Sequence, residues 1–196
     1  MRPMDLFLTR RMLKQKLVLL LSSLMAATQL SAQLPAARLL TVFPPGAKAG
    51  SSIEVAISGV DLDDPMQLYF SYPGIKAKLK IAEKTGQPET NKFVVTISAE
   101  VPPGLYDARF VGRFGASNPR AFAVGDLNEI CEPASNNSPD TAAALPTGTT
   151  VNGHASANNA DHFKLMAKKG QRILIECAAR AIDSRLDPVL ELFDMK

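Results

Sequence analysis

Residues 52–58 read Ser-Ile-Glu-Val-Ala-Ile-Ser, and this stretch decides the fold class. Successive side chains of an extended strand point to opposite faces, so its apolar residues share one face and its polar residues share the other. Segments 92–97 and 105–111 show similar alternation and are rich in β-branched and aromatic residues, which strands favour. After Gln33 we find no convincing stretch with helical periodicity. The pattern predicts an all-β protein.

Turn signals separate these strands and indicate how they pack. Pro-Pro-Gly occurs at 44–46 and again at 102–104, and Tyr-Pro-Gly occurs at 72–74. Pro and Gly end strands and form tight turns. Strands about ten residues apart with such turns between them are typical of sandwiches and barrels. We therefore predict a small β-sandwich over residues 33–125.

The composition changes after Val124. Residues 129–150 are rich in Asn, Ser, Pro, Thr and Ala, which is typical of a linker or a long loop. Strand-like alternation then returns in three segments, 162–166, 172–177 and 189–193. We predict a linker or loop at 126–148 and a second, smaller β domain at 149–196.

Residues 1–32 have the pattern of a secretory signal peptide. Basic residues precede an apolar run that starts at Leu17, and the small residue Ala32 lies where a signal peptidase would cut. The run is shorter than the about 20 residues that span a bilayer, which disfavours the alternative of an uncleaved anchor. We predict a helical signal peptide at the N-terminus. The protein is then secreted, cell-surface or periplasmic, with no membrane span after cleavage.

Removal of residues 1–32 changes the charge of the chain. The whole sequence carries a net charge of +3, whereas the remainder has 17 Lys and Arg against 18 Asp and Glu, a net charge of −1. The basic character therefore belongs to the export signal. Because nucleic-acid binding relies on neutralising phosphates with Lys and Arg, we expect no nucleic-acid partner.

Residues 38–124 resemble an immunoglobulin-like domain of the IPT/TIG type. The resemblance rests on the order of five segments over this length: 44–50, 55–62, 68–70, 101–106 and 115–118, followed by the strand 121–124. It implies an Ig-like sandwich that serves as a spacer or a binding module. A fold of this kind does not by itself define a function.

Residues 129–196 resemble the first part of a bacterial pre-peptidase C-terminal domain. The resemblance rests on Glu132-Pro133 with the run 136–139, and on four later segments: 151–153, 161–163, 168–172 and 184–190. It implies a jelly-roll-like β-sandwich that is appended to secreted proteins, often peptidases, and is associated with substrate or matrix binding. The fold expectation is thus tandem β-sandwiches, Ig-like and then partial jelly-roll-like.

The domains of that family normally continue past the Leu-Asp-Pro strand, which here is 186–188. We therefore expect an incomplete second sandwich, whose inner face lacks a partner sheet and whose edge invites pairing. The alternative is a complete small domain that is closed by dimerisation.

Calcium is the metal that the second resemblance implies. Calcium takes six to eight oxygen ligands. The five residues that the resemblance nominates are Glu132, Asn136, Asn137, Asn159 and Asp161. The alternative is an Asn-rich turn whose side chains bind their own backbone.

Cys131 and Cys177 are the two cysteines of the chain. An exported protein meets an oxidising compartment, in which the two thiols could form a disulfide. Cys177 also shares a strand face with Ile173 and Ile175, so the alternative for it is a buried free thiol.

The sequence contains no Gly-x-Ser-x-Gly elbow, no His-Glu-x-x-His and no phosphate-binding loop. We therefore predict a protein that is not an enzyme. Its predicted role is extracellular spacing, adhesion or substrate targeting, with an extracellular protein or a polysaccharide matrix as its partner. The alternative is the N-terminal, non-catalytic part of a secreted peptidase or other hydrolase whose catalytic domain is absent from this chain.

Overall fold

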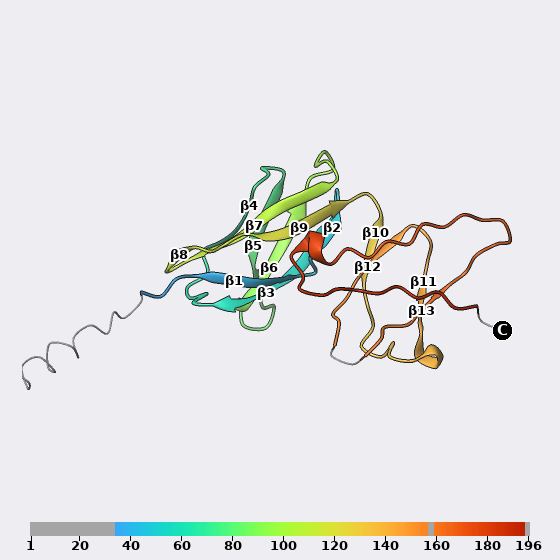
Figure 1. Ribbon diagram of the computed structural model, residues 1–196. Helices are drawn as coiled ribbons and strands as arrows, with labels where there is room; N and C mark the ends of the chain where they lie inside the picture. The colour runs from blue at the N-terminus through green and yellow to red at the C-terminus, as the bar shows by residue number, and fades with distance from the viewer. Residues whose placement is uncertain (1–33, 157–158, 195–196) are drawn as a thin grey trace, which may run out of the picture. The chain divides into compact units, whose positions relative to one another are not determined.

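Two sheets that face each other form the main body of the structure (Figure 1). A computed structural model describes residues 34–156 and 159–194, so the predicted signal peptide at 1–32 lies outside the described residues. In strand order, the first sheet consists of β1 (Arg38–Phe43), β3 (Ser52–Val60), β6 (Pro88–Ile97) and β5 (Ile75–Ile81). All of its neighbouring strands are antiparallel.

The second sheet contains the remaining strands of the sandwich. Its order is β2 (Gly46–Lys48), β9 (Arg120–Gly125), β7 (Gly104–Gly112) and β4 (Gln67–Phe70), and the short β8 (Gly115–Ala116) pairs with β7. The pair β2–β9 is parallel and the others are antiparallel. Taken in chain order, this arrangement matches the ABED and GFC sheets of immunoglobulin-type domains, with β2 added at one edge.

The large apolar residues of 52–58 face the core, and the polar residues face away from it, as the alternation predicts. Val55 and Ile57 on β3 are buried, and the partner strand β6 contributes Phe93 and Val95 from the same face. Phe110 on β7 and Phe122 on β9 come from the opposite sheet and are fully buried. The core lies between the two sheets, and the all-β prediction is confirmed.

The aromatic residues of β4 and of the turn after it differ in burial. Phe70 is buried and its ring meets that of Phe122 edge-on, with centroids 5.1 Å apart, while Tyr69 is exposed. Tyr72, in the turn after β4, packs against the rim of the core. Its ring lies 5.2 Å from that of Tyr106.

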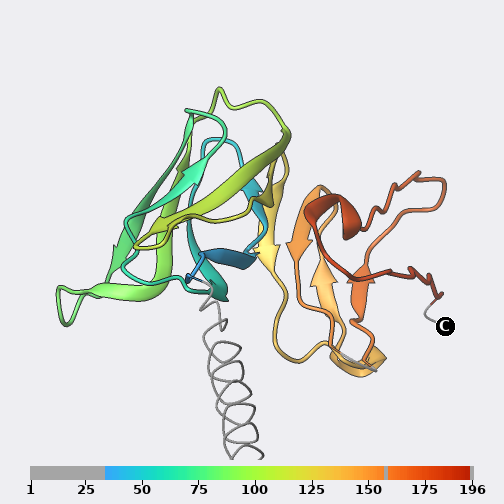
Figure 2. The same ribbon diagram turned by 60° about the vertical axis from the view of Figure 1, so that its left-hand side comes forward.

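Two small sheets follow the sandwich, and each consists of two parallel strands (Figure 2). One pairs β10 (Asn128–Cys131) with β12 (Thr149–Asn152), and the other pairs β11 (Ala143–Leu145) with β13 (Phe163–Leu165). Two single-turn 3₁₀ helices complete the elements, η1 (Pro139–Thr141) and η2 (Arg180–Ile182). Residues 126–148, predicted as a linker or loop, thus contain β10, η1 and β11.

Of the three strands predicted after residue 160, the structure contains one. The segment 162–166 includes β13, but the strands predicted at 172–177 and 189–193 are wrong. Both segments lack a neighbouring strand among the described residues. Alternation decides which side chains share a face, whereas a strand also needs a hydrogen-bonded partner.

From Ala36 onward, the described residues form one compact unit. None of the helices in the described part of the chain has the length and apolar character needed to cross a membrane.

Candidate functional site

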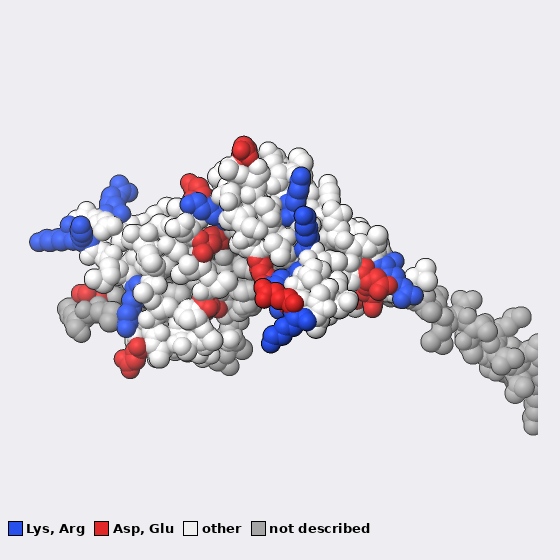
Figure 3. Space-filling model, turned by 180° about the vertical axis from the view of Figure 1, so that it is seen from behind, with Lys and Arg blue, Asp and Glu red and all other residues white. Residues whose placement is uncertain are grey.

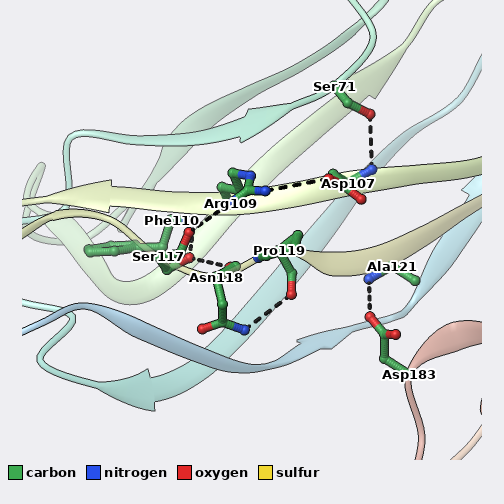
Figure 4. A network of polar contacts seen from close by, with 9 residues as sticks. All are labelled: Ser71, Asp107, Arg109, Phe110, Ser117, Asn118, Pro119, Ala121 and Asp183. Carbon is green, nitrogen blue, oxygen red and sulfur yellow. Dashed lines mark hydrogen bonds and ion pairs between the residues drawn. The ribbon is translucent and has the colours of Figure 1, made fainter.

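The edge of β9 is one place where the chain after residue 126 contacts the sandwich (Figure 4). Strand β2 pairs with only the last three residues of β9, 123–125. The N–H of Ala121 lies beyond that pairing and donates to the Asp183 carboxylate, with N and Oδ2 2.7 Å apart. The guanidinium of Arg120 donates to the backbone oxygen of Asp183 over 2.8 Å. Asp183 therefore extends the hydrogen-bonded edge of β9 past Gly46, the first residue of β2.

The local fold of η2 positions Asp183 for this contact. Asp183 follows η2 directly and has a φ of 61°, a left-handed conformation that Asp tolerates better than most residues. The N–H of Ser184 closes the turn on the carbonyl of Ala179 over 3.0 Å. Ala179 is buried where η2 meets β9. A short turn with one buried alanine and one carboxylate thus attaches the later chain to β9.

A second polar cluster lies on the approach to β9. Asn118 accepts from the N–H of Leu39 over 3.0 Å and donates to the carbonyl of Leu39 over 2.9 Å, so its amide replaces a strand partner for β1. Ser117 accepts from the N–H of Phe110 and donates to the carbonyl of Asn118. Arg109 donates to the carbonyl of Ser117 over 3.0 Å (Figure 4).

This cluster is suited to holding strands together and not to nucleophilic catalysis. Ser117 is only 2% exposed, and its hydroxyl already donates one hydrogen bond and accepts another. A nucleophilic serine needs an adjacent base and access to substrate. The hydroxyl of Ser117 has neither among the described residues.

A pocket of about 430 Å³ lies between the sandwich and the β10–β12 pair. Its polar lining includes Lys48, Glu129, Cys131 and Asn152. The amide of Asn152 donates to Glu129 over 2.7 Å. Burial raises the pKa of Glu129, and the hydrogen bond from Asn152 opposes this only in part.

The environment of Cys131 disfavours the thiolate form of its side chain. Partial desolvation raises the pKa of Cys131, and the negative charges of Glu129 and Glu132 raise it further. A cysteine nucleophile acts as the thiolate, which needs a lowered pKa. Cys131 and Cys177 are both free and exposed, so the buried thiol proposed as an alternative for Cys177 is wrong. Their pairing stays a prediction.

The structure brings some of the predicted calcium residues together. The carbonyl of Asn136 accepts from the N–H of His162 over 2.7 Å, which sets Asp161 beside the 132–137 segment. The carboxylate of Glu132 lies elsewhere, at the end of β12, where it accepts from the N–H of His154. Asn137, Asn159 and Asp161 are exposed.

Calcium usually takes several carboxylates among its six to eight oxygens. The five predicted residues supply two, and the carboxylate of Glu132 already has a backbone partner. In the described ranges, His, Cys, Asp and Glu form no cluster of three that could hold a metal. Asn136 is 2% exposed, and its Nδ2 has no hydrogen-bond partner in that part of the chain. Calcium binding therefore stays a prediction that needs a direct titration.

The charged side chains form no single-sign patch on the face seen in Figure 3, where basic and acidic groups are interspersed. Some of them are paired with each other on the outer face of the first sheet, where Lys80 pairs with Glu54 and Lys92 pairs with Glu89. Hydrogen bonding to Lys80 lowers the pKa of Glu54. Opposite charges in contact leave little net field to attract a polyanion.

Sequence reasoning did not single out Asp183, Asn118 or Glu129. Asp183 precedes Ser184 in an ordinary polar stretch, and nothing in its neighbours indicates a contact with β9. No model of a protein family matches the chain, and no curated protein matches it. The function is therefore inferred from the contacts themselves.

Proposed function

We propose that this chain is an exported, non-catalytic β-sandwich protein that holds a fixed spacing outside the cell, for adhesion or for targeting to a protein or polysaccharide matrix. The observation that carries the proposal is the attachment of η2 to β9 through Asp183. A spacer needs parts that do not move relative to each other. The contact between η2 and β9 restrains the later chain against the sandwich.

Two further contacts restrain the same part of the chain. The ammonium of Lys48 on β2 donates to the side chain of Asn128 over 3.2 Å. The ring of Phe43 lies against the ring of His154, with centroids 3.8 Å apart. Only two residues separate the end of β9 at Gly125 from the start of β10. Contacts at three separate places, joined by so short a connection, oppose hinge motion between the sandwich and the later strands.

The non-catalytic part of the proposal rests on the chemistry of two candidate nucleophiles. Ser117 is buried with its hydroxyl engaged in hydrogen bonds, and the raised pKa of Cys131 disfavours its thiolate. The exported part rests on the basic and apolar pattern of residues 1–32. N-terminal sequencing of the protein from the medium or periplasm tests it, and we expect a start at Gln33.

The spacing is tested by a distance measurement on the full chain. Spin labels are attached to Tyr69→Cys and Ala144→Cys, which are both exposed, after Cys131 and Cys177 are replaced by Ser. Pulsed electron–electron double resonance measures the distance between the two labels, and we expect one narrow distance distribution. Asp183→Gly keeps the left-handed turn available and removes the carboxylate, so it should broaden the distribution.

Glu191→Ala is the matched control, because Glu191 is an exposed carboxylate without an ion pair in the described ranges. It should leave the distribution unchanged. A broad distribution in the protein with native Asp183 would show a flexible tether, and the spacer proposal would then be wrong.

A further inference from the structure

The segment 172–178 is a strand-like stretch whose backbone is unused. In the part of the chain that the structure describes, none of its N–H or C=O groups makes a hydrogen bond. Figure 1 shows it as a plain trace that leads into η2. The segment also contains the β-branched residues Ile173 and Ile175, which favour strands. A backbone of this kind without hydrogen-bond partners can pair with another strand.

Two large apolar side chains of this segment are exposed. Leu174 is 82% exposed and Ile175 is 43% exposed. In an extended conformation, Arg172, Leu174 and Glu176 share one face. An apolar residue therefore lies between a positive and a negative residue, at equal spacing on either side.

This order of charges makes the segment complementary to itself. If two copies pair antiparallel about a two-fold axis at Leu174, Arg172 of each copy lies opposite Glu176 of the other. Ile173 then lies opposite Ile175, again twice. Moving the axis to residue 173 or 175 removes both charge pairs. Opposite charges in directly paired positions stabilise a sheet, so the charges select one register.

We propose that residues 172–176 of two copies of this chain pair in this register and form a two-fold dimer. The nearby segment 186–194 is a poorer partner for 172–176. Its Pro188 has no N–H to donate, and its charged residues are all acidic. A second copy supplies both the complementary charges and a full set of backbone groups.

The test is a charge-reversal cycle on the protein as recovered after export, followed by sedimentation equilibrium. The unchanged protein should show a monomer–dimer equilibrium. Arg172→Glu places Glu opposite Glu at both ends, and Glu176→Arg places Arg opposite Arg, so each should weaken the dimer at least tenfold. The double variant Arg172→Glu with Glu176→Arg restores both pairs, and its dissociation constant should return close to that of the parent.

Both residues are exposed in the monomer, so these substitutions leave its core intact. Arg185→Glu makes the same charge change at an exposed residue outside the segment, and it should not alter the dissociation constant. A protein that stays monomeric overturns the proposal, as does a dimer that survives both single reversals. Failure of the double variant to restore the dimer overturns the proposed register. Hydrogen-exchange protection of amides 172–176 in a pure monomer would show that the chain itself covers this edge, which also overturns the proposal.

Discussion

The hydroxyl of Tyr106 fixes the turn that leads into β7. It donates to the carbonyl of Pro102 over 2.7 Å, and its ring packs on Tyr72. Immunoglobulin-type sandwiches use a tyrosine at the start of the corresponding strand in the same way. Tyr106→Phe removes the hydrogen bond and keeps the ring, so we expect a loss of about 1 kcal/mol in the free energy of unfolding, measured with urea.

Tyr69→Phe is the control for this experiment. Tyr69 is 50% exposed, and its hydroxyl makes no hydrogen bond within the described residues. Its removal should change the free energy of unfolding by less than about 0.5 kcal/mol. Equal losses in the two variants would contradict the role assigned to Tyr106.

Glu129 should make stability depend on pH. Burial raises the pKa of Glu129 in the folded protein, so the folded state holds this proton more tightly than the unfolded state does. As pH rises from about 4, near the ordinary value for Glu, the unfolded state loses the proton first and stability falls. The fall ends once the pH has passed the raised pKa.

Glu129→Gln keeps an oxygen that accepts from Asn152 and removes the charge. We expect the variant to match the parent in acid and to be more stable than the parent at neutral pH, as measured by urea unfolding across this range. Glu83→Gln, at an exposed site, is the comparison and should follow no such trend. A difference between Glu129→Gln and the parent that is constant with pH would contradict the prediction.

At the scale of elements, the contact between η2 and β9 should slow the hydrogen exchange of one backbone amide, that of Ala121. The Ala121 N–H is protected by the Asp183 carboxylate and by no strand. Asp183→Gly should speed hydrogen exchange at Ala121 at least tenfold, because its hydrogen-bond acceptor is lost. The Ala123 amide donates to the carbonyl of Pro45 and should keep its exchange rate. Unchanged exchange at Ala121 would contradict the contact.

The elements of the sandwich were predictable because its strands are half-buried. Segments 52–58, 92–97 and 105–111 fall within β3, β6 and β7, and their inward residues are the buried ones. The same reasoning failed at 172–177 and 189–193, where alternation is present and a partner strand is missing from the described residues. Periodicity shows which side chains share one face of a strand, but it does not show which strand pairs with it.

The candidate site was beyond sequence reasoning for a related reason. Asp183 meets Ala121 across 62 positions, and Asn118 meets Leu39 across 79. The contacts depend on how the sheets are stacked and, for Ala121, on where β2 begins. From sequence alone, the short polar segment 183–185 is indistinguishable from an ordinary turn.

At the scale of the whole molecule, the calcium prediction is tested by thermal unfolding. If the predicted set of Glu132, Asn136, Asn137, Asn159 and Asp161 holds the ion, millimolar calcium should raise the unfolding temperature, because a ligand that binds only the folded state stabilises it. Asp161→Asn should reduce this rise, whereas Asp194→Asn, at an exposed site outside the predicted set, should keep it. An unfolding temperature that is the same with calcium and with a chelator would exclude the site.

The pairing of β2 with β9 has a consequence for how the protein is made. Gly46 lies beside Ala123, and Leu39 contacts Asn118, so β2 finds its partner strand only near the end of the sandwich, although β1 pairs with the nearby β3. Contacts so distant in sequence slow folding, because a long loop must close before they form. A chain that emerges N-terminus first therefore cannot close this sandwich until residues near 125 have appeared. If the protein is exported as we propose, this delay keeps the chain unfolded while it crosses the membrane.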